Sequence, residues 1–254
     1  MAEIHQSGDW RAEHWLQFSQ SLRTARSREE TVRALTDVIA PYGYTTFIYG
    51  RIFGAPIDPL TTPVVTNLSS EWMQYYTEQK FYLADFAADH CRTGSGALLW
   101  SEADRKIASG EWPPKYAVVR AAAGAFGLGA GATIPLSKQG RYKGGISLIA
   151  PKQGSVDAHD RLFEEYSPEI ISIAEAFHTS INFSVIAREH YGLSPREVAV
   201  LQLASEGLQT KQIAAEFDTS PHTVEKQMKS AREKLGTRTT AEAVTNAALL
   251  ALVK

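Results

Sequence analysis

Residues 193–236 have the sequence LSPREVAVLQLASEGLQTKQIAAEFDTSPHTVEKQMKSAREKLG, which contains the clearest structural signals in the chain. Ser194-Pro195-Arg196-Glu197 is a capping box with proline at the first helical position. The serine side chain can accept a hydrogen bond from a free helix N–H, while Glu197 reaches back to the serine N–H. Ser220-Pro221 repeats this serine–proline start, and Gly207 suits the end of the first helix. We therefore predict two helices that begin at these caps.

The flanking segments complete a compact helical unit. We expect Thr210 to cap a short helix over KQIAAEF and Phe217-Asp218-Thr219 to form a tight connection. Thr239 and Glu242 form a second capping box, which opens an apolar helix that reaches Val253. The sequence thus predicts an all-α domain of four short helices.

The helix that starts after Ser220 has an apolar face and a basic face. Its apolar positions recur at helical spacing and form one stripe: Val224, Met228, Ala231 and Leu235. A short helix, a three-residue turn and a longer helix form a helix-turn-helix, whose second helix fits the DNA major groove. Two sets of contacts are predicted: base edges for His222, Thr223 and Lys226, and phosphates for Lys229, Arg232 and Arg238.

Charge alone would favour a plain solvated helix in a small bundle, because residues 220–238 hold only five basic and two acidic residues. The caps, the turn length and the apolar stripe favour DNA binding instead. The segment resembles the LuxR-type DNA-binding domain of bacterial transcription regulators. The resemblance rests on these positions: Glu197, Leu201, Gly207, Ile213-Ala214, Ser220, Thr223-Val224 and Lys234-Leu235. Gln227 departs from the family, in which many members have His, and this leaves the target DNA sequence open.

The preceding part of the chain has the pattern of an α/β domain. Helices are expected over 10–26, 28–40, 70–79, 85–92, from Pro113-Pro114 to Ala123, and over 157–190 with a restart at Ser167-Pro168. Strands are expected over 44–53, 62–66, 97–100, 132–136 and 145–150, with the last two forming a hairpin and Pro63 favouring a sheet edge. This pattern predicts an α/β sandwich, in which an antiparallel sheet of about five strands lies between helices.

Length and charge agree with two domains. The 254 residues suit an α/β domain over 1–175, a helical linker over 176–192 and a helix-turn-helix domain over 193–254. The net charge of −2 disfavours a protein that binds nucleic acid by bulk charge. However, residues 190–254 hold 8 Lys and Arg against 7 Asp and Glu, while the rest of the chain holds 18 against 21. The charge distribution thus separates an acidic α/β domain from a nearly neutral helix-turn-helix domain.

A second motif lies within the α/β domain. Trp72, Tyr76, Asp85 and Trp100 follow the pattern W-x3-Y-x8-D-x14-W, and Gly131-Ala132-Thr133-Ile134-Pro135 comes after it. This pattern resembles the acyl-homoserine-lactone-binding domain of quorum-sensing LuxR regulators. Taken alone, the aromatic residues are also compatible with an ordinary core, and Asp85 is compatible with a helix cap.

The resemblance implies a role for each residue toward an N-acyl or aryl homoserine lactone. The Trp72 indole would donate to the lactone carbonyl, and Asp85 would accept the ligand amide N–H. The Tyr76 hydroxyl would donate to the acyl carbonyl, with Ser147 as a second candidate, and Trp100 would pack on the lactone ring. Because a buried carboxylate is costly, ligand binding is expected to be coupled to folding.

Three positions depart from the resemblance: Leu68 where several relatives have Tyr, Met73 where some have Arg, and Phe86 where relatives often have Pro. These departures leave the ligand tail open. A phosphorylated receiver is a weak alternative, since the strand over 44–53 has no acidic residue. A lactone hydrolase lacks support because neither an H-x-H nor a G-x-S-x-G motif occurs. An orphan regulator that responds to another small molecule, or to none, stays open.

The remaining expectations concern partners and location. We predict a homodimer on palindromic double-stranded DNA, with RNA polymerase as a candidate partner. Residues 168–190 and the last helix are candidate dimer surfaces, with the internal core as the alternative for both. Cys91 is the single cysteine, and we expect no disulfide framework, metal or cofactor. The N-terminal residues lack the apolar core of a signal peptide, and no apolar run reaches the ~18 residues of a membrane span. We therefore expect a cytoplasmic protein that is not an enzyme.

Overall fold

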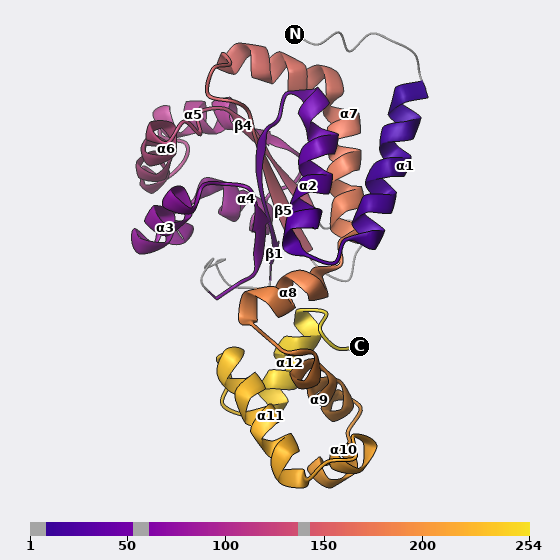
Figure 1. The fold of residues 1–254 in the computed structure, drawn as a ribbon. Helices are drawn as coiled ribbons and strands as arrows, with labels where there is room; N and C mark the ends of the chain where they lie inside the picture. The colour runs from indigo at the N-terminus through magenta and orange to yellow at the C-terminus, as the bar shows by residue number, and fades with distance from the viewer. Residues whose placement is uncertain (1–8, 53–60, 137–142) are drawn as a thin grey trace. The chain divides into compact units, whose positions relative to one another are not determined.

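A computed structural model describes residues 9–52, 61–136 and 143–254 of the chain. These residues divide into two compact units (Figure 1). The first takes in the described residues up to Ala25 together with Glu29–Ile181, and the second consists of Arg26–Arg28 and Asn182–Lys254.

The first unit is built on a five-stranded antiparallel sheet. Its strands are β1 (Thr46–Ile52), β2 (Val64–Thr66), β3 (Leu98–Leu99), β4 (Gly131–Leu136) and β5 (Lys143–Ile149), in the order β2-β1-β5-β4-β3. The predicted pairing of the last two strands is confirmed, although most of their turn lies outside the described residues. β2 is an edge strand, as Pro63 before it favours. The predicted antiparallel sheet of five strands is confirmed.

Helices cover both faces of this sheet (Figure 1). One side carries α1 (Asp9–Thr24), α2 (Arg28–Ile39) and α7 (Val156–Ser180). The other side carries α3 (Ser70–Glu78), α4 (Phe86–Thr93), α5 (Trp100–Ala108) and α6 (Lys115–Ala125). Two short 3-10 helices, η1 (Ala40–Tyr42) and η2 (Phe81–Leu83), complete the unit. The predicted sandwich is therefore correct.

Along the central strands, successive side chains point to opposite sides of the sheet. Phe47 and Tyr49 of β1 are fully buried and make edge contacts with Phe177 of α7. Ile48 and Ser147, which pair across β1 and β5, instead line a cavity beside the other helices. Because side chains alternate along a strand, one face builds the core and the other face builds the cavity.

Two predictions about this unit were wrong. Residues 97–100 were expected to be one strand, but β3 ends at Leu99 and Trp100 is the first residue of α5. The helix over 157–190 was expected to restart at Pro168, but α7 continues through this proline and ends at Ser180. Proline removes the N–H that would bond the Glu164 carbonyl, and the Ser167 hydroxyl donates to that carbonyl at 3.5 Å instead. The break falls at residues 181–182.

The second unit is all-helical. Its elements are α8 (Phe183–Tyr191), α9 (Pro195–Ser205), α10 (Thr210–Glu216), α11 (Pro221–Lys234) and α12 (Thr240–Leu249). The capping boxes at Ser194 and Thr239 and the cap at Ser220 are confirmed. The cap predicted at Thr210 is wrong, since the helix starts there and the Gln212 side chain accepts from the N–H of Gln209. The last helix ends before the predicted Val253.

An ion pair joins the first and third of the four predicted helices. Glu197 of α9 is buried, and the Lys234 ammonium of α11 donates to both of its oxygens at 2.8 and 2.9 Å. Burial opposes ionisation of Glu197, but hydrogen bonds from Lys234, Ser230 and Ser194 outweigh it and lower the pKa of this carboxyl to about 2. The predicted apolar stripe of α11 faces the core, with Val224, Ala231 and Leu235 buried.

Candidate functional sites

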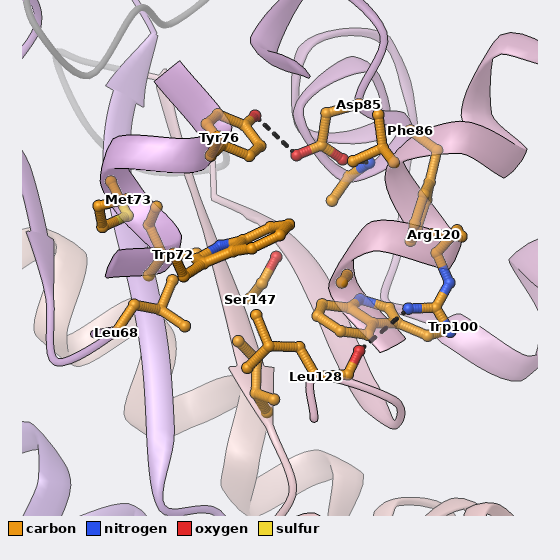
Figure 2. A pocket seen from close by; sticks show the side chains of 15 residues that line it. Leu68, Trp72, Met73, Tyr76, Asp85, Phe86, Trp100, Arg120, Leu128 and Ser147 are labelled. Atoms are coloured by element: carbon orange, nitrogen blue, oxygen red, sulfur yellow. Dashed lines mark hydrogen bonds between the residues drawn. The ribbon is translucent and has the colours of Figure 1, made fainter. Parts of the chain in front are cut away.

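The five residues predicted to bind a ligand line a single cavity of about 540 Å³ between the sheet and helices α3–α6 (Figure 2). They come from separate elements: Trp72 and Tyr76 from α3, Asp85 from the start of α4, Trp100 from the start of α5 and Ser147 from β5. The rest of the wall consists of Ile48, Leu68, Met73, Phe86, Ala87, Val119, Arg120, Ala123, Leu128 and Ile149. Apart from the carboxylate of Asp85 and the guanidinium of Arg120, this wall carries no charge.

Asp85 joins α3 to α4. Its Oδ1 accepts from the N–H of Ala87 at 2.8 Å and so caps α4, as the helix-cap interpretation predicts. Its Oδ2 accepts from the Tyr76 hydroxyl at 2.9 Å. Burial raises the pKa of Asp85, although both hydrogen bonds favour the ionised form. The Tyr76 proton is therefore used by Asp85, and this hydroxyl is not also a donor toward the cavity.

A second hydrogen-bonded chain crosses the floor of the cavity. The Trp100 indole N–H donates to Thr133 Oγ1 at 2.9 Å, and this hydroxyl lies 2.9 Å from Ser147 Oγ. If Thr133 donates to Ser147, the Ser147 proton is left available to a ligand. Gly131 permits this arrangement, because a Cβ there would lie 3.0 Å from the Trp100 ring. Thr133 belongs to the GATIP motif, but its role in fixing Trp100 was missed from sequence.

Trp72 is the centre of an aromatic cluster. Its ring centroid lies 5.1 Å from that of Phe126, 5.7 Å from that of Tyr76 and 6.3 Å from that of Phe81. Among the described residues we find no hydrogen bond to its indole nitrogen. Figure 2 shows the Trp72 and Trp100 rings projecting toward the same space. Trp72 is therefore held by its ring and keeps a donor for the cavity.

Arg120 of α6 closes one wall of the cavity. Its guanidinium lies 5.1 Å from the Trp100 ring centroid and binds Asp104 of α5 through two bonds of 2.7 and 2.8 Å. It also donates to the carbonyls of Leu128 and Gly129. One side chain thus joins α6, α5 and the segment before β4. No local sequence signal marks Arg120, because its partners are distant along the chain.

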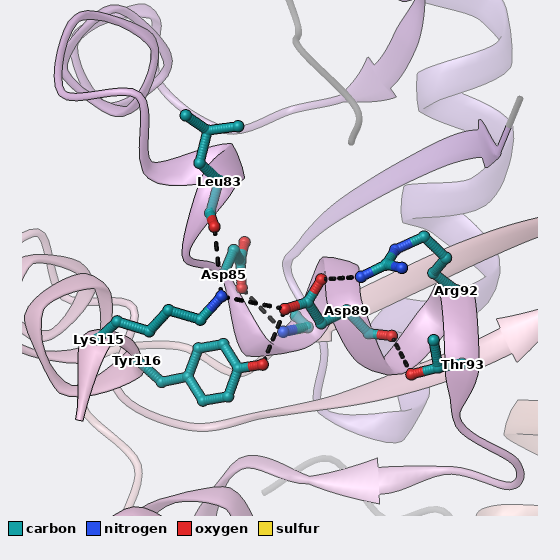
Figure 3. Close-up of polar contacts among 8 residues, drawn as sticks. Leu83, Asp85, Asp89, Arg92, Thr93, Lys115 and Tyr116 are labelled. Carbon is teal, nitrogen blue, oxygen red and sulfur yellow. Dashed lines mark hydrogen bonds and ion pairs between the residues drawn. The ribbon is translucent and has the colours of Figure 1, made fainter. Parts of the chain in front are cut away.

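The start of α6 is held by a polar cluster around Asp89 (Figure 3). The Tyr116 hydroxyl donates to Asp89 Oδ2 at 2.8 Å, and Lys115 Nζ lies 3.7 Å from the same oxygen. Arg92 approaches the other carboxylate oxygen. Burial opposes ionisation of Asp89, but these partners outweigh it and lower the pKa of the carboxyl. Polar contacts therefore hold α6 at its start, through Lys115 and Tyr116, and at its middle, through Arg120.

A second cavity of about 510 Å³ adjoins the first. Ile48, Tyr76, Asp85, Ala87 and Ser147 line both, so the two spaces meet at the polar residues. The rest of the second wall is made of small or aliphatic residues: Gly50, Val64, Ala88, Cys91 and Gly145. The sequence motifs give no indication of this space.

The predicted DNA-contacting residues of α11 do not share one environment. His222, Lys226 and Lys229 are exposed, whereas Thr223 is half-buried and its Oγ1 lies 2.9 Å from the Ser220 hydroxyl. Arg232 is also half-buried, and it donates to the Arg238 carbonyl at 3.2 Å. Arg232 was expected to contact a DNA phosphate. In the structure its guanidinium already makes a contact within the unit. Among the described residues, no cluster of His, Cys, Asp and Glu could hold a metal ion.

Two models of known protein families match the chain. Residues 27–181 match the autoinducer binding domain, and residues 192–247 match the luxR family of bacterial regulatory proteins. The chain belongs to the LuxR family of autoinducer-binding transcription regulators. It is accordingly a DNA-binding protein with a helix-turn-helix domain and a small-molecule signal site, and the families it matches are not enzyme families.

Solved structures resemble this LuxR-family chain in fold. The N-acylhomoserine lactone dependent LuxR family transcription factor CepR2 from Burkholderia cenocepacia has a TM-score of 0.51 at 14% identity, covering 67% of this chain and 94% of that one. SdiA in complex with octanoyl-rac-glycerol has a TM-score of 0.47 at 17% identity, covering 98% and 99%. Escherichia coli SdiA has a TM-score of 0.46 at 19% identity, covering 96% and 98%. No curated protein sequence matches the chain.

None of the described helices is individually long and apolar enough to cross a bilayer. One bent pair, α7 with α8, has the length and composition for it, but eight of the α7 residues are buried inside the unit.

Proposed function

We propose that this LuxR-family protein is a receptor for an N-acyl or aryl homoserine lactone, and that it binds a palindromic DNA site as a homodimer. The observation that carries the proposal is the meeting of Trp72, Tyr76, Asp85, Trp100 and Ser147 in the wall of one cavity. Such a ligand has one amide donor, two carbonyl acceptors and an apolar tail. A buried ligand needs a partner for each polar group, because an unpaired one costs about 1–3 kcal/mol.

The available donors and acceptors match those needs. The indole N–H of Trp72 would donate to the lactone carbonyl, and the Asp85 carboxylate would accept the amide N–H. Because the Tyr76 proton already serves Asp85, Ser147 becomes the better donor to the acyl carbonyl. Tyr76 would then position Asp85, and the Trp100 ring, fixed by Thr133, would pack on the lactone. This division differs from the sequence-based expectation, in which Tyr76 was the preferred donor.

The DNA-binding part of the proposal places α11 in the major groove. The exposed His222 and Lys226 would reach base edges, Lys229 would contact a phosphate, and Thr223 and Arg232 are retained as candidate contacts. Residues 168–190 and α12 are the candidates for the dimer contact through the side chains that they leave exposed, because their buried side chains serve the internal core. RNA polymerase is a candidate partner of the bound dimer.

The proposal is tested by expressing the full chain with separate acyl- and aryl-homoserine lactones. Soluble yield, thermal unfolding and the mass of any co-purified ligand are measured. We expect at least one lactone to raise the unfolding temperature and to co-purify, because a ligand that binds only the folded state stabilises it. Failure of every lactone to bind the folded protein would overturn the receptor assignment and favour an orphan regulator.

Two variants examine the roles within the site. Trp72→Phe keeps a ring in the aromatic cluster but removes the indole donor, so lactone affinity should fall about tenfold or more. Tyr75→Phe is the matched control, because Tyr75 lies on the same helix and is not among the residues that line either cavity. Equal affinity of Trp72→Phe and the unchanged protein would remove Trp72 from the proposed contacts.

A further inference from the structure

We propose that Glu225 of α11 reads a cytosine in each half of the DNA site, by accepting a hydrogen bond from the N4 amino group of that base. The inference rests on the proposed function, because it adds one residue to the base contacts of the same helix. It follows from the exposure of the side chains along α11, from the absence of a partner for the Glu225 carboxylate and from the chemistry of the base edges.

The exposure of the first turns of α11 indicates which side chains are available to enter a groove. His222, Glu225 and Lys226 are exposed. Thr223, which was expected to contact a base, is half-buried, and its hydroxyl lies 2.9 Å from that of Ser220. Because the N-terminal residues of a recognition helix meet the base edges, Glu225 takes the place that was expected for Thr223.

Helical spacing places the Glu225 carboxylate beside two lysines. His222, Glu225 and Lys229 recur at i, i+3 and i+7 and therefore share one face of α11, and Lys226 is the next residue along the chain. The phosphates of a duplex repel a carboxylate, and the two ammonium groups reduce this repulsion. Glu225 is thus the single acidic side chain on a part of the helix that otherwise attracts DNA.

The Glu225 carboxylate has no role inside the protein. Among the described residues, no hydrogen bond or ion pair reaches it, although Lys229 lies at the i+4 spacing of a helical ion pair. The Lys229 ammonium instead lies 3.8 Å from the carboxylate of Glu233. Of the two acidic residues of α11, Glu233 therefore has a cation nearby, and Glu225 keeps both oxygens for a ligand.

The base edges in the major groove determine what such a carboxylate accepts from. Cytosine presents the N4 amino donor, whereas guanine presents two acceptors and thymine presents an acceptor and a methyl group. Adenine presents the N6 donor beside the N7 acceptor. Because an ionised carboxylate only accepts hydrogen bonds, guanine and thymine repel it and N7 opposes it at adenine. Glu225 therefore favours cytosine over the other bases, by about tenfold or more.

Two substitutions separate the charge of Glu225 from its hydrogen bonding. Glu225→Gln keeps the shape but supplies an amide, which forms paired bonds to N6 and N7 of adenine. The preferred base at this position should therefore change from cytosine to adenine. Glu225→Ala should remove the preference and bind a random-sequence duplex at least as tightly as the unchanged protein, because a negative charge near the phosphates is lost. The exposed position allows both variants to fold.

The experiment selects bound duplexes from a random-sequence library with the full chain, expressed separately with acyl- and aryl-homoserine lactones and without ligand. The selected sequences are compared for the unchanged protein, the two Glu225 variants and Glu233→Ala. Glu233→Ala is the matched control, because it removes the same charge from an exposed position near the C-terminal end of the same helix. Affinities for the selected duplex, with the cytosine replaced by each other base, then measure the discrimination.

The outcomes separate this inference from the proposed function. Cytosine for the unchanged protein and for Glu233→Ala, adenine for Glu225→Gln and no preference for Glu225→Ala would support it. The same preferred sequence in the unchanged protein and both Glu225 variants would overturn the role of Glu225 and leave base reading by α11 standing. Failure of the unchanged protein to select any sequence under every condition would overturn the proposed base reading by α11 itself.

Discussion

The Tyr76 hydroxyl donates a 2.9 Å hydrogen bond to Oδ2 of Asp85, at the junction of the two cavities. This contact connects α3 to the start of α4 and keeps the carboxylate in the wall of both cavities. It uses a proton that the resemblance to quorum-sensing receptors had assigned to the ligand. The bond therefore divides the polar residues into those that position Asp85 and those that remain free to contact a ligand.

The first prediction concerns the free-energy cost of burying the ionised Asp85 carboxylate in the ligand-free protein. Burial raises the pKa of Asp85 in the folded protein, so folding favours the protonated carboxyl. The stability that this gives is fully present below the unfolded pKa and is lost as the pH rises through the folded pKa. Asp85→Asn removes this cost and keeps a side chain that can cap α4. We expect the ligand-free variant to be at least as stable as the unchanged protein at neutral pH, while lactone affinity falls about tenfold or more.

Thermal unfolding at acidic and neutral pH, with and without lactone, checks this prediction. Asp157→Asn is the control, because Asp157 is an exposed residue near the start of α7. A ligand-free Asp85→Asn variant that is clearly less stable at neutral pH would show that Asp85 is mainly a structural cap.

The second prediction concerns Arg120 and ligand release. Arg120→Met keeps an apolar stem against Trp100 but removes the bonds to Asp104 and to the carbonyls before β4. Because α6 then loses a tie over the cavity, the lactone should dissociate about tenfold faster. The rate is followed by intrinsic fluorescence after dilution.

Arg105→Met, on the exposed side of α5, serves as the control for the loss of a cation. If both variants release the lactone at the rate of the unchanged protein, Arg120 has no part in closing the cavity.

The third prediction concerns acid stability of the C-terminal unit. The pKa of Glu197 is lowered to about 2, so its stabilising contribution is present above the unfolded pKa of about 4.3 and is lost as the pH falls toward about 2. Glu197→Gln should lower the free energy of unfolding by about 2–3 kcal/mol at neutral pH and flatten the acid dependence. Glu216→Gln, an exposed change on α10, should do neither. An unaltered acid profile in Glu197→Gln would contradict this assignment.

The fourth prediction separates two basic residues of α11. Lys229 is exposed and pairs only loosely with Glu233 at 3.8 Å, whereas Arg232 bonds the Arg238 carbonyl. Lys229→Ala should weaken binding to a random-sequence duplex and reduce the slope of affinity against salt by about one, because one phosphate contact is lost. Arg232→Ala should chiefly lower the stability of the unit. The reverse pattern would assign the phosphate contact to Arg232.

Local signals were sufficient for part of this structure. The caps at Ser194, Ser220 and Thr239 depend on residues three apart, and alternating strands specify the sheet, so both were predictable. Helix α5 was missed because no side chain caps its start after Leu99. Pro168 was misinterpreted as a helix start because proline is favoured there, yet α7 accommodates it within an otherwise regular helix.

The candidate site shows the same division. The motif spacing led to Trp72, Tyr76, Asp85 and Trp100, but not to the contacts among them. Arg120 and Thr133 act through partners that are distant in sequence, and the second cavity arises from the pairing of Gly50 with Gly145 across two strands. Such features depend on strand register and helix packing, which a single sequence specifies only through the folded structure.

The central claim is that Asp85 accepts the amide N–H of an acyl homoserine lactone inside this cavity. The most direct test is a calorimetric titration of the full chain with octanoyl homoserine lactone and with the ester analogue, in which oxygen replaces the amide N–H. The account predicts that the ester binds about 10- to 100-fold more weakly, because a hydrogen bond to a charged acceptor is lost. Equal affinity for the two compounds would contradict it.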